Sequence, residues 1–494
     1  MCESCSSGGF SRRAFLAASG AFGAAGMISS ALAGEAAQPA APPMPRREKQ
    51  PARVRVVFMY PPADVVDAGQ NEDSWRVHNW FTWPGNQFEP EAQQRKFTQK
   101  IQEMAARLGV VAEFAPRAIY QEARIREFID KAKADTPDAV LVVNFWNTLA
   151  KASFRIATES APTAIVYQPV GGNHQLPPEE LRTGEGFYYI HSIENWDEIE
   201  RGLLAVRAKK MLAQSRLLRV AGKPPKQVRE PRLEVDIVAA PAEEFNALFD
   251  AVSADEAIVR QAMELKNAAA QVTGVTDEYF VEAMRAHCAV NQIMERYGAD
   301  AITIECLFLK HRKPCLSFAI NNGRLVPCGC ENHLDGALTL MLGRWLLERA
   351  GFLHNPEFDL SENRYFGAHC TCAWKLHGPE GPSQEYRVRP FFHQLPKTAA
   401  LDVQWTPGEP VMLAKYLSGQ DTLCCWTGKA IESPACPPTG GCATRLLMEV
   451  DRLDDVCRAY HGAHPVFFCG DRGDARRLKA FARMYRLKLE GNLA

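Results

Sequence analysis

"VRVVFMY", at residues 54–60, is an apolar run rich in β-branched side chains, as expected of a strand buried on both faces of a sheet. Two more runs of this type follow, "DAVLVVNF" at 138–145 and "TAIVYQ" at 163–168. Amphipathic segments at 89–108 and 120–134 lie between the first strand and the second. This alternation predicts a parallel sheet with helices on both faces, in which ligands bind at the carboxyl ends of the strands.

Polar and aromatic residues follow the ends of these strands. Asn144 and Trp146 come just after one strand and His174 just after the next, so all three are candidate substrate contacts. Turn formation explains such residues equally well. Trp80 belongs to the aromatic cluster "WRVHNWFTW" at 75–83, for which stacking on a sugar ring and burial at a domain or subunit contact are both open.

The middle of the chain repeats the alternation of helices and strands. A helix over 194–222, ended by Gly222, precedes a Pro-rich break. Further elements are expected as strands at 233–240, 299–306 and 314–320 and as helices over 242–252, 255–270 and 277–297. From about residue 353 the helical periodicity fades, and short apolar runs between Pro, Gly, aromatic and Cys residues indicate an antiparallel barrel or sandwich.

Length and charge limit the classes of protein. A chain of 494 residues is long enough for two or three domains, each with its own core. The formal net charge is -1 with acids and bases interspersed, so the chain lacks the basic surface by which proteins bind nucleic acid. We expect a small-molecule ligand and no nucleic-acid partner.

The N-terminal 33 residues have the features of an export signal. Arg12 and Arg13 precede a weakly hydrophobic, Ala- and Gly-rich run, and a small-residue cleavage site lies after Ala33. The pattern resembles a twin-arginine signal, although Ala17 stands where that motif usually has Lys. We expect a periplasmic or secreted protein, and an uncleaved membrane anchor is the alternative.

Thirteen of the fifteen cysteines follow this cleavage site, because Cys2 and Cys5 precede it. All thirteen lie between Cys288 and Cys469. Their odd number and their crowding into one half of the chain are unlike a disulfide framework of a small secreted domain. We expect mostly buried thiols with one or two bridges.

The stretch "VPCGCENHLDGALTLM" at 326–341 contains the first of four candidate metal ligands. Glu331 lies in it, and Asp359, His369 and His464 follow later in the chain. Two carboxylates and two imidazoles suit a six-coordinate divalent ion that keeps open positions for substrate. A zinc clamp built from the Cys pairs of the region is the rival prediction, although single-residue spacing is too short for the usual structural zinc site.

Four segments resemble the L-fucose and L-arabinose isomerase superfamily. "CENHLDGALT" at 330–339 looks like the C-E-G-D-x-x-G-A-L-T segment of that family, and Asp359 falls near its second carboxylate. "YFGAHCTC" at 365–372 resembles its G-A-H and H-C segments. The stretch that begins with "GAHPVFFCGD" at 462 is similar to its closing segment.

The resemblance implies a fold with two doubly wound Rossmann-like α/β domains and a β-rich, barrel-like C-terminal domain. With the N-terminal features it divides the chain into an export signal at 1–33, a Pro/Ala-rich linker at 34–52, and domains at 53–175, 176–352 and 353–494. Related isomerases assemble as trimers or hexamers, so a homo-oligomer is expected by analogy.

The resemblance also implies the chemistry. Family members interconvert aldoses and ketoses through a cis-enediol, using a divalent ion, most often Mn²⁺, with Co²⁺, Mg²⁺ or Zn²⁺ as alternatives. By this likeness Glu331 and Asp359 are metal ligands and the proton-transfer pair, His464 completes the metal shell, and His369 is a further ligand or a substrate contact.

Two features depart from the family. His333 stands where the family has a carboxylate, which makes it a candidate substrate contact and leaves open an epimerase or lyase acting on the same kind of compound. Export is the second departure, because the related sugar isomerases are cytoplasmic. A non-catalytic extracytoplasmic sugar-binding protein is therefore the other class of function that we consider.

Overall fold

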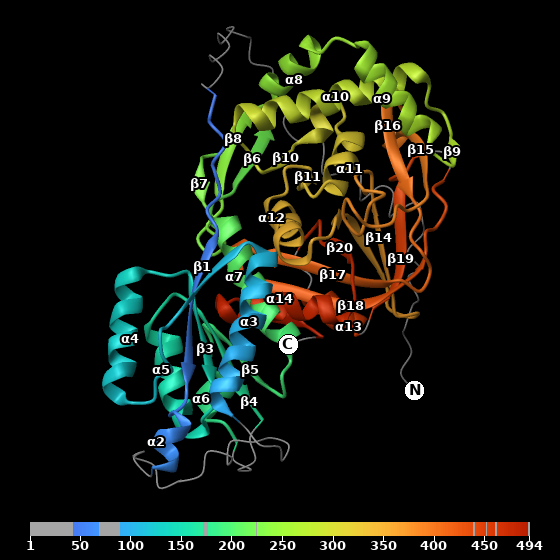
Figure 1. Ribbon diagram of the computed structural model, residues 1–494. Helices are drawn as coiled ribbons and strands as arrows, with labels where there is room; N and C mark the ends of the chain where they lie inside the picture. The colour runs from blue at the N-terminus through green and yellow to red at the C-terminus, as the bar shows by residue number, and fades with distance from the viewer. Residues whose placement is uncertain are drawn as a thin grey trace, which may run out of the picture. The chain divides into compact units, whose positions relative to one another are not determined.

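The computed structural model describes residues 43–68, 89–170, 176–223, 225–437, 440–450, 452–459 and 462–492. The first sheet is parallel throughout and has the strand order β2-β1-β3-β4-β5 (Figure 1). Its strands are β1 (Ala52–Met59), β2 (Val110–Phe114), β3 (Ala139–Asn144), β4 (Ala164–Pro169) and β5 (Phe187–Ser192). The parallel sheet predicted from the buried runs is confirmed.

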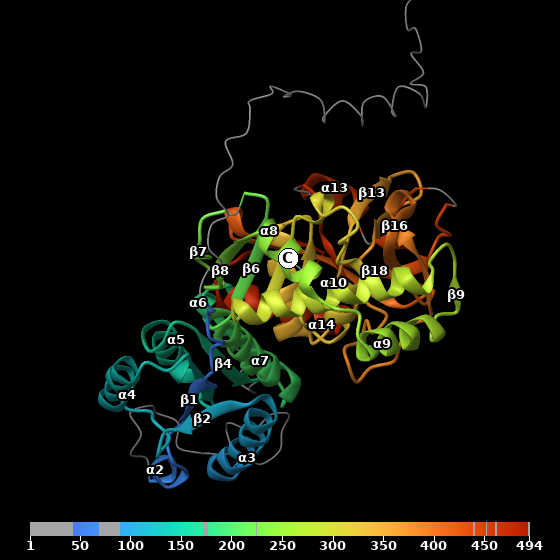
Figure 2. The same ribbon diagram turned by 90° about the horizontal axis from the view of Figure 1, so that it is seen from above.

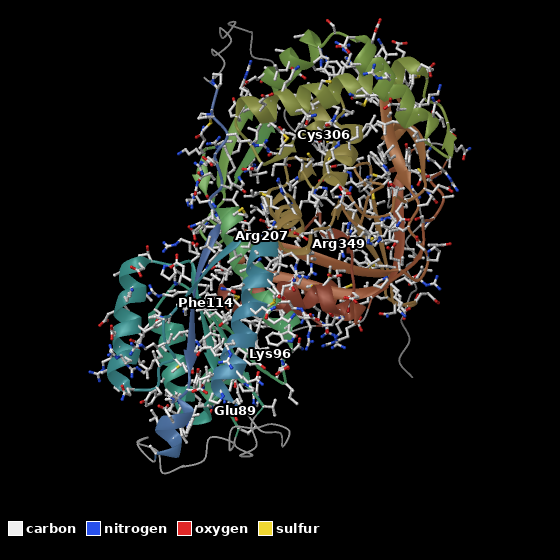
Figure 3. The ribbon with its side chains drawn as sticks, in the orientation of Figure 1. Glu89, Lys96, Phe114, Arg207, Cys306 and Arg349 are labelled. Atoms are coloured by element: carbon white, nitrogen blue, oxygen red, sulfur yellow. The ribbon has the colours of Figure 1, made fainter. Side chains whose placement is uncertain are left out.

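Helices cover both faces of this sheet. The larger ones are α3 (Pro90–Leu108), α4 (Glu122–Asp135), α5 (Ala150–Glu159) and α7 (Trp196–Ala213), with short helices α2 (Ala63–Asp67) and α6 (Glu179–Thr183). Val56 and Phe58 of β1 share a core with α3 and α7, whereas Val57 and Met59 share one with α4 and α5. Phe114 of β2 stacks on Phe58 at a ring separation of 6.4 Å (Figure 3). Because successive side chains of a strand point to opposite faces, both sets are buried.

The second sheet has the order β11-β10-β6-β8-β7, parallel except for β7. Its strands are β6 (Arg216–Ala221), β7 (Val228–Arg229), β8 (Asp236–Pro241), β10 (Ala301–Ile304) and β11 (Cys328–Cys330). The helices of this region are α8 (Ala242–Ala251), α9 (Glu256–Asn267), α10 (Asp277–Arg296), α11 (Cys315–Gly323) and α12 (Leu334–Leu342). α10 packs on α8, on α9 and on strand β16 (Leu395–Val403) (Figure 2) and so joins this sheet to the β-rich region.

Two predicted elements of this region are wrong. The helix expected over 194–222 ends at Ala213, and the chain continues as β6, in which Leu217, Leu218 and Val220 are buried. The strand expected at 314–320 is α11, all of whose residues are buried. A fully buried helix and a strand buried on both faces have the same continuous apolar pattern, so periodicity does not distinguish them.

The C-terminal region contains an eight-stranded sheet in the order β12-β20-β17-β18-β19-β14-β13, with β21 beside β18. Its strands are β12 (Phe352–Leu353), β13 (Asn355–Asp359), β14 (Arg364–His369), β17 (Pro410–Leu417), β18 (Thr422–Glu432), β19 (Thr444–Val450), β20 (Val466–Cys469) and β21 (Lys488–Gly491). A three-stranded sheet consists of β9 (Gln271–Val272), β15 (Tyr386–Phe391) and β16 (Leu395–Val403).

A single residue, His354, separates β12 from β13, which lie at the two ends of the eight-stranded order. The sheet therefore curves until its two ends meet at His354. This side chain is fully buried, stacks on Phe467 at 3.7 Å, and hydrogen-bonds the Tyr365 hydroxyl through Nε2 at 2.8 Å. Burial lowers the pKa of His354 to about 3, so the ring is neutral and structural.

The first sheet extends across the domain boundary expected at residue 175, and the described part of the expected linker contacts the second α/β region. β5 pairs with β4 and belongs to the first sheet, although it follows residue 175, where the first domain was expected to end. The expected linker also makes ordered contacts, because Lys49 Nζ donates to Asp300 Oδ1 at 2.8 Å and Met44 N donates to Arg296 O at 2.7 Å.

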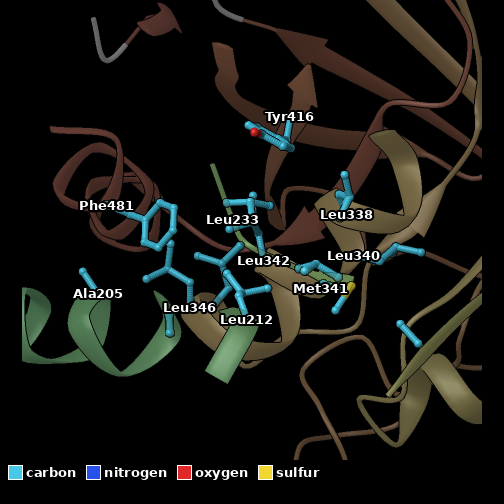
Figure 4. Close-up of a cluster of buried hydrophobic side chains, with 14 of the residues drawn as sticks. Ala205, Leu212, Leu233, Leu338, Leu340, Met341, Leu342, Leu346, Tyr416 and Phe481 are labelled. Carbon is cyan, nitrogen blue, oxygen red and sulfur yellow. The ribbon is translucent and has the colours of Figure 1, made fainter. Parts of the chain in front are cut away.

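A large hydrophobic core lies where α7, α12 and α14 (Arg472–Met484) meet (Figure 4). Leu212 of α7, Leu342 of α12 and Phe481 of α14 are all fully buried in it. This packing fixes α12, whose N-terminus follows the Glu331 stretch. None of the helices in the described part of the chain is long and apolar enough to span a membrane.

Candidate functional site

Glu331, His369 and His464 come together in the structure. Glu331 directly follows β11, His369 is the last residue of β14, and His464 precedes β20. One donor atom from each lies within 4.8 Å of the others. The carboxyl end of a strand in the second sheet thus meets two strand ends of the eight-stranded sheet, and the three side chains converge there.

The spacing of the donor atoms suits a metal ion. His464 Nε2 lies 3.3 Å from Glu331 Oε2, and His369 Nε2 lies 3.6 Å from Glu331 Oε1. Two ligands of one ion at bond lengths of about 2.1 Å are about 3 Å apart. Both Nε2 atoms are buried and have no hydrogen-bond partner among the described residues. Because buried polar atoms without partners are costly, these three residues are a candidate site for a metal ion.

The carboxylate dominates the electrostatics of the cluster. The imidazoles of His369 and His464 hold the pKa of Glu331 well below its usual range. Burial lowers the pKa of His464, and Glu331 opposes this only in part. For His369 burial acts in the same direction, but the contact with Glu331 outweighs it and the pKa is raised. Glu331 is therefore ionised and available as a ligand or a base.

The two histidines differ in their readiness to bind an ion. His369 Nδ1 accepts a hydrogen bond from the backbone N–H of Cys370 at 2.8 Å, which leaves the proton of a neutral ring on Nε2, facing Glu331. Binding through Nε2 requires this proton to move to Nδ1 and the Cys370 hydrogen bond to break. His464 makes no such bond with either ring nitrogen among the described residues, so it is the readier ligand.

The backbone is strained at two of the three residues. Glu331 has φ 56° and His464 has φ 65°, in the left-handed region that costs a non-glycine residue about 1 kcal/mol. Neighbouring contacts hold both turns. Arg219 Nε donates to Asn332 Oδ1 at 2.9 Å beside Glu331, and Lys415 Nζ donates to Ala463 O at 2.7 Å beside His464.

Asp359, predicted as the second carboxylate ligand, does not belong to this cluster. It lies at the tip of the β13–β14 hairpin, paired with Arg364, five residues along β14 from His369. Five residues of a strand span about 17 Å. The exposed carboxylate instead accepts hydrogen bonds from the backbone N–H and the hydroxyl of Ser361 at the turn. The prediction of Asp359 as ligand and proton carrier is therefore wrong.

His333, the departure from the family pattern, lies beside the cluster. It is the N-cap of α12, where its Nδ1 accepts the Gly336 N–H at 3.0 Å, and its ring meets that of His464 edge-on at 4.8 Å. Burial lowers the pKa of His333 to about 4, so the ring is neutral. The neutral His333 ring lies beside His464, so His333 adds no second negative charge to the cluster.

Two of the predicted substrate contacts, Asn144 and Trp146, lie in the region of the first sheet and make local contacts there. Asn144 is fully buried at the end of β3, where its Oδ1 accepts the Trp146 N–H at 3.0 Å. Trp146 is 1% exposed and packs against Val66. These contacts fit the turn and packing roles that were the alternative. His174 and Trp80 lie outside the described residues.

All cysteines from Cys288 onward are free thiols, most of them buried. Cys328, Cys330, Cys370 and Cys372 join no group of three metal donors in the described part of the chain, which disfavours the zinc clamp at these pairs. The sulfur atoms of Cys306 and Cys330 are 2.9 Å apart (Figure 3 labels Cys306).

Sequence reasoning missed Lys415, which braces the turn before His464. Its side chain is 5% exposed although it lies within the apolar strand β17. A lysine inside the run "PVMLAKYL" was the available signal, because a buried ammonium group needs partners.

Comparison with known proteins found no family model that matches the chain and no curated protein that matches it. Any assignment of function therefore depends on the residues of the site and on the segment resemblance.

Proposed function

We propose that the chain is an exported, metal-dependent carbohydrate isomerase with a fucose/arabinose isomerase-like fold. In this proposal the two parallel sheets belong to Rossmann-like domains, and the eight-stranded sheet is the barrel-like C-terminal domain. The observation that carries the proposal is the convergence of Glu331, His369 and His464, with unpartnered ring nitrogens at the separations that one ion requires.

One carboxylate and two imidazoles hold the ion, and water or substrate fills its other positions. Mn²⁺ suits this mixed oxygen and nitrogen set best, with Co²⁺, Mg²⁺ and Zn²⁺ as alternatives. When bound, such an ion supplies Lewis-acid polarisation of a sugar carbonyl and its neighbouring hydroxyl.

Glu331 carries the proton. In the aldose-to-ketose direction its ionised carboxylate takes the C2 hydrogen as a proton and returns it to C1 on the same face. The hydroxyl proton leaves O2 to solvent and O1 takes one from solvent, so that the carbonyl and the hydroxyl exchange places. His369 and His464 are each 3% exposed, whereas the Glu331 side chain is 28% exposed and can be reached by a substrate.

Location and assembly belong to the proposal on sequence grounds. The twin-arginine-type signal places the protein in the periplasm or outside the cell, and the family resemblance gives a homo-oligomer. Residues 1–42 lie outside the described residues.

The experiment that tests this function is hydrogen exchange next to the carbonyl. The Mn²⁺-loaded protein is incubated in D₂O with a panel of aldoses and ketoses, and deuterium at C1 and C2 is followed by NMR. We expect exchange and interconversion with at least one sugar, and a loss of about 100-fold or more in the Glu331→Gln variant. Asp359→Asn is the matched control, because it removes a carboxylate of the same region outside the cluster.

Each outcome separates the alternatives. Exchange without aldose–ketose interconversion indicates an epimerase or lyase. Binding of a sugar with no exchange, in protein that holds Mn²⁺, contradicts the isomerase and favours the sugar-binding protein. Equal rates for the parent and Glu331→Gln would remove Glu331 from the mechanism.

A further inference from the structure

A second group of donor side chains lies apart from the Glu331 cluster, near the ends of strands β17 and β20 of the eight-stranded sheet. His377 lies in the segment between β14 and β15, Glu409 directly precedes β17, and Cys469 ends β20. One donor atom from each lies within 4.8 Å of the others. The antiparallel pairing of Val411 with Cys469 brings Glu409 and Cys469 together, and the His377 segment closes over them.

Each donor is shielded from water to a different degree. Cys469 is fully buried, the Glu409 side chain is 12% exposed, and the His377 side chain is 28% exposed. Glu409 Oε1 contacts His377 Nε2 at 2.6 Å, whereas Glu409 Oε2 is buried with no hydrogen-bond partner among the described residues. A buried carboxylate oxygen without a donor costs free energy, so a cation bound at this oxygen would stabilise the site.

We propose that His377, Glu409 and Cys469 form a second metal site that binds Zn²⁺ or a similar borderline-soft divalent cation. Imidazole nitrogen, carboxylate oxygen and thiolate sulfur are the three ligand types that zinc uses in proteins. Three protein ligands leave the fourth tetrahedral position for water at the partly exposed His377 side. The ion ties the 370–385 segment to the sheet and satisfies Glu409 Oε2.

Binding exchanges protons for the ion. The 2.6 Å contact between His377 and Glu409 is a hydrogen bond, and two ligands of one zinc ion lie about 3 Å apart, so the ring proton leaves and the two groups separate by a few tenths of an ångström. Burial and the charge of Glu409 raise the pKa of the Cys469 thiol, and Arg349 (Figure 3) opposes this. Metal binding at this site therefore releases protons and weakens as the pH falls.

Cobalt distinguishes this site from the Glu331 cluster, because a cobalt–thiolate bond gives a charge-transfer absorption that nitrogen and oxygen ligands do not give. The full-length metal-free protein is titrated with Co²⁺ and, separately, with Zn²⁺ under reducing conditions. We expect the thiolate band in the parent and in Glu331→Gln, and its loss in Cys469→Ser and in His377→Ala. Zinc content measured with a chelating dye should fall by one equivalent in the same two variants.

The controls keep the outcome clear. Cys370→Ser changes a thiol beside the Glu331 cluster and should leave the band intact, and the partly exposed His377 makes His377→Ala the variant least prone to unfold. A band that persists in both His377→Ala and Cys469→Ser, or a folded parent without any band, overturns the second site. Neither result bears on the isomerase proposal, which rests on Glu331 and is tested by hydrogen exchange.

Discussion

Replacing Glu331 with Gln removes the negative charge that lies between two buried imidazoles. A unit positive charge 3.3 Å from this carboxylate, the distance to His464 Nε2, interacts with it by about 5 kcal/mol at an effective dielectric constant of about 20. The attraction of a divalent ion to this carboxylate is stronger, but the cost of desolvating the ion and the carboxylate offsets much of it. Loss of a neighbouring group that only orients a ligand already costs about 10- to 100-fold in metal affinity. We therefore expect Glu331→Gln to weaken Mn²⁺ binding by about 100-fold or more, which is about 2.7 kcal/mol.

Isothermal titration calorimetry of the metal-free protein with Mn²⁺ measures this loss. Asp359→Asn is the matched control, since the Asp359 carboxylate is exposed and serves a turn, and its Kd for Mn²⁺ should stay within about twofold of the parent. Circular dichroism and the urea midpoint confirm that both variants are folded. The reasoning is refuted if Glu331→Gln binds Mn²⁺ like the parent, or if Asp359→Asn loses as much affinity.

Three further predictions concern the surroundings of the site and the pH dependence of stability. Lys415→Met removes the ammonium that holds the carbonyls before His464, so the Kd for Mn²⁺ should rise about 10-fold, and an unchanged Kd in folded protein would contradict this role. Gly336→Ala places a Cβ 2.5 Å from Leu353 Cδ1 and should cost about 1–3 kcal/mol, seen as a lower urea midpoint, whereas an unchanged midpoint would mean that α12 shifts freely. Burial raises the pKa of Asp402 to about 6, above its value in the unfolded chain, so the folded state binds the extra proton and stability falls as the pH rises from about 4 to 6. Asp402→Asn should abolish this loss and be more stable than the parent at pH 7 by about 2 kcal/mol, and parallel pH profiles of the two proteins would count against it.

The sequence predicts the first sheet well for a physical reason. Strands such as β1 and β3 are buried on both faces, so most of their positions are apolar. Short β-branched runs of this kind, separated by amphipathic helices, have few other interpretations. The same reasoning fails at α11, where a helix is buried on all sides and loses its period. Whether a segment is buried on all sides depends on tertiary packing, which the local sequence pattern does not encode.

The candidate site was only partly predictable. The family resemblance placed Asp359 with the other ligands, but a tight hairpin puts it at the far end of β14 from His369. Spacing along the chain does not show which strands pair or where a hairpin turns, and these decide which end of a strand a side chain occupies. Glu331, His369 and His464 come together because each lies at or beside a strand end where a sheet meets its neighbour.

The same limit explains why the sequence did not predict the second group of donors. His377, Glu409 and Cys469 come from three segments, and their approach depends on the pairing of β17 with β20 and on the path of the 370–385 segment.

Backbone strain helps to decide which of these groups is built for function. Positive φ also occurs at ordinary turns of the chain, such as Glu348 and Asp421, so strain at Glu331 and His464 alone marks nothing. At these two residues it coincides with burial, with a low carboxylate pKa at Glu331 and with ring nitrogens at His464 that have no partner in the described part of the chain. If such a turn were selected only for its shape, glycine would stabilise it by about 1 kcal/mol relative to the residue present, and an unsatisfied imidazole would not be needed. Strain, burial and an unsatisfied imidazole thus coincide at one point of the fold, and a metal ion bound there would offset their combined cost.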